Sequence, residues 1–157
     1  MAFFLSLDGQ GEPGLIIGVS NPAALLAFPP IPVGDNSSFS NASVQLSTSN
    51  VQITSVASDL NKGVVFIAMS DTIYMIHNYT ISENNFCTSM NPVFTGKSSA
   101  FGQIVVDYIS NNLYWCDALH QWIAMKPAYN STNDIYKVLV HEDLRQPEGL
   151  ALDPEKR

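Results

Sequence analysis

Aspartates recur at a nearly regular spacing, and they are the residues of this chain best able to do chemistry. Asp59, Asp107 and Asp153 each end a short apolar run and stand 48 and 46 residues apart, and Asp117 ends a further run. Paired carboxylates can act as general acid and base. A short carboxylate also accepts hydrogen bonds from the N–H groups of turns. We expect that structural role here, because nothing in the sequence predicts an unusual environment for these carboxylates.

The other reactive side chains form no catalytic or metal-binding pattern. His77, His120 and His141 are scattered near strand ends, without a helical His-x-x-x-His pair, so we expect them at the surface. Cys87 and Cys116 fit neither a disulfide framework nor a zinc site, although one disulfide between them stays an alternative. Cys116 follows an aromatic pair inside a predicted strand, which predicts a buried, unreactive thiol. The sequence therefore predicts no enzyme, no metal site and no cofactor.

The composition is that of one β-rich domain. The 157 residues are 46% hydrophobic and 13% charged, which is enough apolar material for one packed core. Val, Ile, Tyr and Phe are interspersed with Asn, Ser and Thr, which favours strands and turns over long helices. The formal net charge is −7 without any Lys or Arg run, so nucleic acid and anionic membranes are poor partners. No apolar window of about 18 residues occurs, and the apolar residues 1–7 lack the other features of a signal peptide.

An internal repeat organises the predicted strands. Three segments align on an aspartate: Ser55–Asp59, Gln103–Asp107 and Gly149–Asp153. In the first two units, turn residues lead to further short strands, which we predict at Val65–Ala68, Thr72–Ile76, Leu113–Cys116, Trp122–Met125 and Tyr136–Val140. Four short strands in about 40 to 50 residues are typical of one blade of a β-propeller, whose faces are buried only by neighbouring blades.

Before the first repeat, the pattern is looser. Leu15–Asn21 and Leu25–Phe28 predict two strands around an Asn-Pro turn. The stretch from Pro29 to Asn50 is rich in Pro, Ser and Asn, which predicts an exposed loop with one strand at Ser43–Leu46.

The most specific motif is Leu113-Tyr114-Trp115-Cys116-Asp117. On this motif and the residues around it, the segment from Gly102 to Arg157 resembles the YWTD repeats, or low-density lipoprotein receptor class B repeats, which build six-bladed propellers. The positions that match the family pattern are Asp107, Tyr114, Trp115, Asp117, Ile123, Pro147, Gly149 and Asp153. We expect structural roles for them, with Tyr114 and Trp115 packed at a blade interface. The chain departs from the pattern at Cys116, where the family has Thr, and at Trp122, where a basic residue is common.

The resemblance divides the chain into parts. We expect a non-propeller segment at 1–14, a divergent first blade with its loop at 15–54, a second blade at 55–101, a YWTD-type blade at 102–148, and the inner strand of a further blade at 149–157. The expected fold is all-β, a partial six-bladed propeller of about three blades of four antiparallel strands. Because a six-bladed ring needs about twice this length, we expect the N-terminal half of one propeller, completed by further blades in a longer protein.

The resemblance implies an extracellular recognition module of an endocytic or signalling receptor, or of a matrix protein, that binds protein ligands. It also implies an epidermal-growth-factor-like module after the propeller, and a membrane association only through an anchor that this chain lacks. Glycosylation sequons at Asn36, Asn41, Asn78 and Asn130 favour the same extracellular location. His120 and Trp122 are candidate ligand contacts, because aromatic residues are enriched at interface hot spots, although we favour packing against the adjacent blade for Trp122.

Two alternatives stay open. A calcium-dependent propeller hydrolase would hold its ion in the central channel with Glu, Asn and Asp from several blades, whereas the matching strand ends here offer only Asp. The other alternative is a truncated fragment without an independent fold or function.

Overall fold

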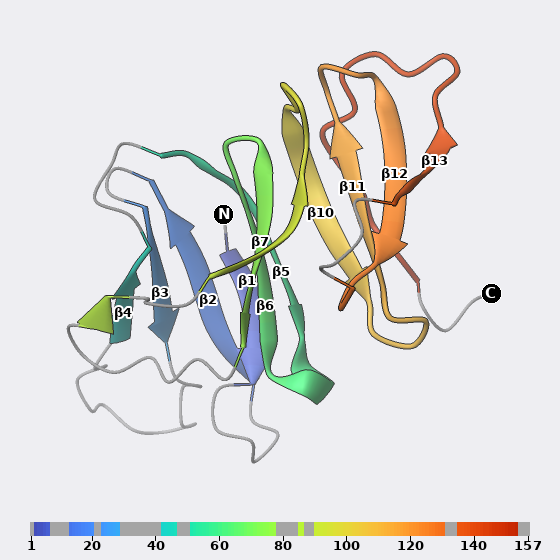
Figure 1. The fold of residues 1–157 in the computed structure, drawn as a ribbon. Coiled ribbons are helices and arrows are strands. Elements are labelled where there is room, and N and C mark those ends of the chain that lie inside the picture. The colour runs from blue at the N-terminus through green and yellow to red at the C-terminus, as the bar shows by residue number, and fades with distance from the viewer. Residues whose placement is uncertain are drawn as a thin grey trace.

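The computed structural model describes residues 2–6, 13–20, 23–28, 42–46, 51–77, 85–86, 90–130 and 135–153. In these residues the chain forms three β-sheets that lie side by side, together with one short 3-10 helix, η1 (Leu60–Lys62) (Figure 1). No helix in these ranges is long and apolar enough to span a bilayer. The prediction of an all-β, partial propeller fold is confirmed.

The first sheet has five strands in the order β1-β2-β3-β4-β8. They are β1 (Ala2–Ser6), β2 (Pro13–Val19), β3 (Ala24–Phe28), β4 (Ala42–Gln45) and β8 (Asn85–Phe86), and β8 runs parallel to β4. We expected residues 1–14 to lie outside the blades. The structure differs, because Ala2–Ser6 forms a backbone ladder with β2, from Ala2 opposite Ile17 to Ser6 opposite Pro13. β1 is therefore the first strand of this sheet.

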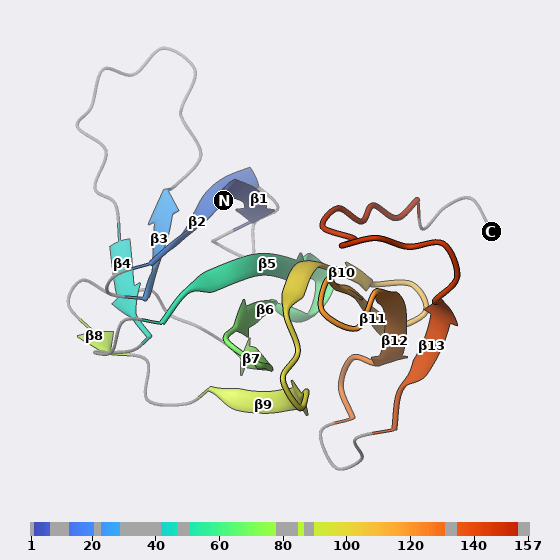
Figure 2. The same cartoon turned by 90° about the horizontal axis from the view of Figure 1, so that it is seen from above.

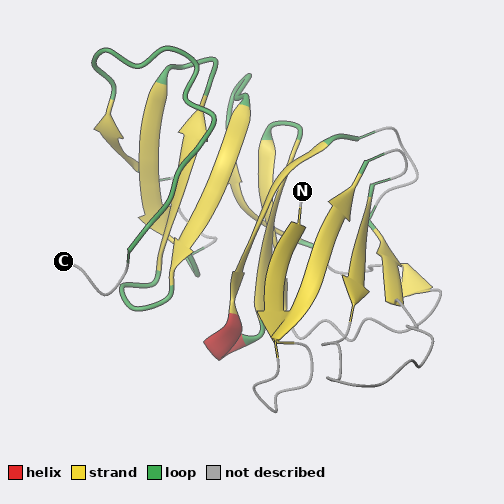
Figure 3. Ribbon diagram, turned by 180° about the vertical axis from the view of Figure 1, so that it is seen from behind, coloured by secondary structure: helices red, strands yellow, loops and turns green. Residues whose placement is uncertain are grey.

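The second and third sheets each have four antiparallel strands. The second consists of β5 (Ile53–Asp59), β6 (Val64–Met69), β7 (Thr72–His77) and β9 (Asn91–Thr95). The third consists of β10 (Phe101–Asp107), β11 (Asn112–Asp117), β12 (Trp122–Pro127) and β13 (Lys137–Val140). Figure 2 shows the first strands β5 and β10 side by side and the last strands β9 and β13 on the outer side, as in propeller blades. Short connections join β5 to β6, β6 to β7, β10 to β11 and β11 to β12, as Figure 3 shows from behind.

Strand β6 packs between two sheets, which explains why all of its residues are buried. Successive side chains of a strand point to opposite faces. On one face of β6, three side chains pack in a hydrophobic cluster with residues of the first sheet: Val65, Ile67 and Met69. On the other face, three side chains pack in a cluster with residues of the third sheet: Val64, Phe66 and Ala68. The second blade therefore depends on both neighbours for its burial.

The expected inner strand at 149–157 is not a strand in its described part, residues 149–153. The segment instead lies against β10: Gln103 N–H donates to Glu148 O (3.0 Å), and Leu150 N–H donates to Gln103 Oε1 (3.1 Å). Gly102 permits this approach, because a Cβ at this position would lie 3.0 Å from Glu148 O. One backbone hydrogen bond and one side-chain hydrogen bond therefore hold this segment against β10, and the segment does not continue the sheet as a strand.

A polar cluster joins the second and third sheets beside η1. The Tyr129 hydroxyl donates to Asp59 Oδ2. The Lys62 ammonium lies 3.5 Å from the centroid of the Tyr129 ring and donates to Asn111 Oδ1. Burial, together with the hydrogen bond to Asp59 and the charge of that carboxylate, raises the pKa of Tyr129. The tyrosine is therefore a neutral donor that connects the two sheets.

Tyr129→Phe is expected to lower the free energy of unfolding by about 1–2 kcal/mol, because it removes a donor from the buried Asp59 carboxylate. Urea unfolding followed by circular dichroism measures the change. Tyr108→Phe is the matched control, since Tyr108 is 41% exposed. Equal stabilities of the two variants would contradict the role assigned to Tyr129.

Candidate functional site

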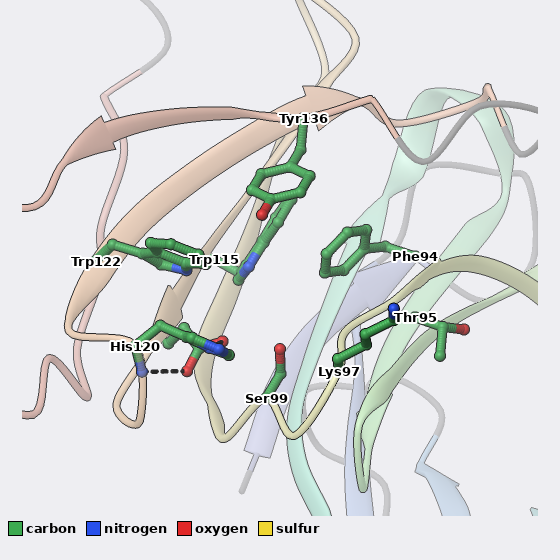
Figure 4. A pocket seen from close by; sticks show the side chains of 9 residues that line it. Phe94, Thr95, Lys97, Ser99, Trp115, His120, Trp122 and Tyr136 are labelled. Carbon is green, nitrogen blue, oxygen red and sulfur yellow. Dashed lines mark hydrogen bonds and ion pairs between the residues drawn. The ribbon is translucent and has the colours of Figure 1, made fainter.

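A pocket of about 290 Å³ lies between the second and third sheets. Its aromatic lining consists of Phe94 of β9, Trp115 of β11, Trp122 of β12 and Tyr136, which precedes β13 (Figure 4). The polar side chains that complete the lining are Thr95, Lys97, Ser99, Asp117 and His120. Residues from both sheets thus meet at one site.

The β11–β12 hairpin positions three of these side chains. Trp115 and Asp117 are alternate residues of β11, so their side chains point to the same face, and both are buried. Asp117 lies directly opposite Trp122 of β12, which makes the two residues cross-strand neighbours. His120 lies in the turn between them, where Gln121 adopts a φ of 58°. Local pairing therefore brings Asp117, His120 and Trp122 together.

The aromatic rings of the pocket pack on one another. The ring centroid of Trp115 lies 4.7 Å from that of Phe94 and 5.9 Å from that of Tyr136. The His120 ring stacks on Trp122 with a centroid distance of 4.7 Å and an interplanar angle of 11°. Trp122 also lies 6.0 Å from Tyr136. Trp115 therefore contacts the second sheet through Phe94, whereas Trp122 packs with rings of its own sheet.

Asp117 is a buried carboxylate that accepts the N–H groups of the β11–β12 turn. Its Oδ1 accepts hydrogen bonds from the N–H groups of Leu119 (3.1 Å), His120 (3.0 Å) and Ala100 (3.3 Å), and its Oδ2 lies 2.8 Å from His120 Nδ1. Burial acts to raise the pKa of Asp117, but hydrogen bonds from His120, Ser99 and Ala100 outweigh burial and lower the pKa. Asp117 is therefore charged at neutral pH.

The other predicted aspartates lie away from this carboxylate. Asp107 accepts hydrogen bonds from Ile109 N–H (2.9 Å) and Ser110 N–H (3.1 Å) in the β10–β11 turn, at the opposite end of β11 from Asp117. Asp153 is exposed in the segment that follows β13. In the part of the chain that the structure describes, no three His, Cys, Asp or Glu residues are grouped so that they could hold a metal ion. Asp107 therefore accepts hydrogen bonds from the β10–β11 turn, and Asp117 accepts them from the β11–β12 turn.

The remaining predicted residues lie outside the pocket lining. Tyr114 is half-buried opposite Met125, and Ile123 lies opposite Cys116 in the same sheet. Pro147 and Gly149 belong to the segment that lies against β10. Among the sequons, Asn130 is exposed after β12, whereas Asn36, Asn41 and Asn78 lie outside the described residues.

Cys116 is a buried free thiol. Its Sγ lies 3.6 Å from Gly149 O, and Cys87 lies outside the described residues. Burial raises the pKa of the Cys116 thiol, against a smaller opposing effect of a backbone hydrogen bond from Gln103. The structure therefore does not support the alternative of a disulfide at Cys116.

In a Cys87→Ser variant, Cys116 is expected to react with a thiol reagent at least about a hundredfold more slowly in the native state than in urea, because only an exposed thiolate is a good nucleophile. The release of thionitrobenzoate at pH 8 measures the rate. Similar native and unfolded rates would show that this thiol is accessible.

Sequence reasoning did not identify Phe94, Lys97, Ser99 or Tyr136 as site residues. Tyr136 begins a run that we predicted as a strand, and its aromatic character was the available signal. Phe94 lies on a strand of the preceding sheet, and its contact with Trp115 depends on how two sheets pack. No local pattern encodes that contact.

Comparisons with known proteins identify a structure of similar fold but no protein of similar sequence. No protein-family model matches the chain, and no curated protein matches its sequence. Among solved structures, a chain in the crystal structure of a nidogen/laminin complex is similar, with a TM-score of 0.66 and 14% sequence identity. The match covers 91% of this chain and 50% of that chain, so this chain spans about half the length of the structure that it matches. That similarity supports the propeller fold.

Proposed function

We propose that this chain is a non-enzymatic, extracellular recognition module, built from YWTD-type propeller blades, that binds protein ligands. The observation that carries the proposal is the similarity of fold to a propeller that was crystallised in a protein complex. The Tyr114-Trp115-x-Asp117 motif adds support from the residues, because it forms β11 and joins two blades through Trp115. A place in a low-density lipoprotein receptor-related protein or in a matrix protein follows from the resemblance of this motif.

We propose further that blades beyond these three sheets complete the ring in the natural protein. The chain covers half of the matched propeller chain, and its first strands β5 and β10 lie side by side as successive inner strands of a ring would. An epidermal-growth-factor-like module after the propeller is the further partner that the resemblance implies.

Surface plasmon resonance with the immobilised chain tests the binding function. Purified laminin and a set of purified extracellular receptor domains serve as analytes, and the expected result is saturable binding that the soluble chain competes. The same preparation is assayed for ester and lactone hydrolysis, and its thermal unfolding is recorded with and without Ca²⁺. Hydrolysis together with a large stabilisation by Ca²⁺ would contradict the proposal and support the calcium-dependent hydrolase. Failure to bind any analyte would also count against it.

Asn130 is expected to carry a glycan when the chain is expressed with a secretory leader, because this sequon asparagine is exposed after β12. Asn130→Gln should remove one glycan step on a denaturing gel, and peptide-N-glycosidase should abolish the difference between wild type and variant. Asn133→Gln, which lies outside any sequon, is the matched control. Identical mobility of wild type and Asn130→Gln before digestion would contradict the prediction.

A further inference from the structure

The pocket between the second and third sheets contains two buried donors that have no partner. The indole N–H groups of Trp115 and Trp122 are both buried and make no hydrogen bond in the structure. Buried polar groups in proteins almost always have a partner, and leaving one without a partner is costly. Both side chains line the pocket, and Trp115 is 0% exposed. An acceptor on a ligand would satisfy these donors.

The indoles present their edges to the pocket more than their faces. One face of Trp122 is covered by the stacked His120 ring, and Trp115 packs against Phe94 and Tyr136. Figure 4 shows the nitrogen atoms of both indoles turned toward the side on which His120 and Ser99 lie. Stacking surface for a sugar ring is therefore limited, whereas two N–H groups are available to an oxygen atom.

The other polar groups of the pocket are one cation, one carboxylate whose oxygen atoms are already occupied, and the hydroxyl groups of Thr95 and Ser99. The Lys97 side chain is exposed at its mouth. The Asp117 oxygen atoms already accept three backbone N–H groups and face His120 Nδ1, and a hydrogen bond from Ser99 also lowers the pKa of this carboxylate. A ligand that only accepts hydrogen bonds thus fits better than one whose hydroxyl groups also need acceptors.

We propose that this pocket binds the carboxylate of an acidic side chain of a protein ligand. The inference rests on the proposed recognition function and names the chemistry that one site would recognise. The carboxylate accepts the N–H groups of Trp115 and Trp122, and the attraction of Lys97 offsets the repulsion from the nearby Asp117 carboxylate. The aromatic walls contact the methylene groups of the same side chain. The net charge of −7 would favour a basic ligand, whereas this pocket favours an acidic side chain. The two differ because the hydrogen-bond donors of the pocket, and not the charge of the whole chain, select the group that binds there.

The test uses the indole signals of the full chain in a ¹H–¹⁵N spectrum. The chain has two tryptophans, so each indole signal reports one of the two donors. The probe is N-acetylglutamate N-methylamide, and N-acetylglutamine N-methylamide and methyl glucoside are the comparison compounds. We expect both indole protons to shift downfield with the glutamate probe, with a dissociation constant on the order of millimolar for so small a ligand. The glutamine compound should bind more weakly, and the glucoside should cause no shift.

Two variants connect the response to the pocket. Trp122→Phe keeps an aromatic ring but removes one donor, and binding of the glutamate probe should weaken about tenfold at the remaining Trp115 signal. Lys97→Met should weaken it about threefold. Lys137→Met is the matched control, because Lys137 is exposed on β13 and does not line the pocket. It should leave binding unchanged.

No shift of either indole up to the solubility limit of the glutamate probe would overturn the inference. A response to the glucoside alone would do the same and would identify a sugar site instead. Because this titration needs no protein partner, its failure is distinguishable from failure of the proposed recognition function, which the plasmon resonance experiment tests separately.

Discussion

Trp115→Ala is expected to lower the free energy of unfolding by about 3–5 kcal/mol, the range for removal of a large buried aromatic side chain. Trp115 is 0% exposed and belongs to the core cluster that the second and third sheets share. Its ring lies 4.7 Å from Phe94 and 5.9 Å from Tyr136, so the substitution leaves a cavity where two sheets meet. Domains of this kind are stabilised by only about 5–15 kcal/mol, so the loss is a large share of the total. Urea unfolding followed by far-ultraviolet circular dichroism measures it.

Trp122→Ala is the control for that prediction. Trp122 is half-buried and packs mainly with His120 and Tyr136 of its own sheet, so its removal should cost about 1–2 kcal/mol. Trp115→Phe should fall between wild type and Trp115→Ala, because the smaller ring keeps part of the contact with Phe94. Equal losses for the two alanine variants would contradict the view that Trp115 joins the sheets.

Local patterns explain which parts of the fold could be predicted. An apolar run that ends in Asp predicts β5 and β10. A strand that is covered on both faces has apolar residues at consecutive positions, and the aspartate after it accepts hydrogen bonds from the N–H groups of the next turn. The strands β6, β7, β11, β12 and β13 follow from apolar runs between turn residues in the same way. The prediction failed to place β1 in a sheet, because strand pairing between β1 and β2 depends on a partner and not on the Ala2–Ser6 sequence alone.

The contacts between sheets could not be predicted from such patterns. Lys126 is 1% exposed in β12, although a lysine in a strand normally predicts a solvent-facing position. Its ammonium group donates to the Val93 carbonyl of β9, so a backbone group of the adjacent sheet provides an acceptor for it. The pocket depends on the same kind of contact, since Phe94 and Trp115 come from different sheets. The motif predicted one wall of the site, and the packing of the sheets provided the other.

The second large effect is expected for Asp117→Ala, which should lower the free energy of unfolding by about 2–4 kcal/mol at neutral pH. The substitution removes a buried carboxylate, so that the N–H groups of Ala100, Leu119 and His120 lose their hydrogen-bond acceptor. It also removes the partner of the His120 ring. Glu142→Ala is the control, because Glu142 is an exposed acidic residue in the segment after β13. Urea unfolding at pH 7 compares the two variants.

The same carboxylate gives stability a defined dependence on pH. Its hydrogen bonds outweigh burial, so the pKa of Asp117 is lower in the folded chain than in the unfolded chain, where it is about 3.9. A lowered folded pKa means that the carboxylate contributes its full stabilisation above the unfolded pKa, and that this contribution is lost as the pH falls through the folded pKa. Asp117→Asn should therefore be less stable than wild type at pH 7, and the difference should shrink below about pH 4. A difference between wild type and Asp117→Asn that stays constant from pH 7 into the acid range would contradict this account, because the hydrogen bonds at Asp117 would then not depend on its charge.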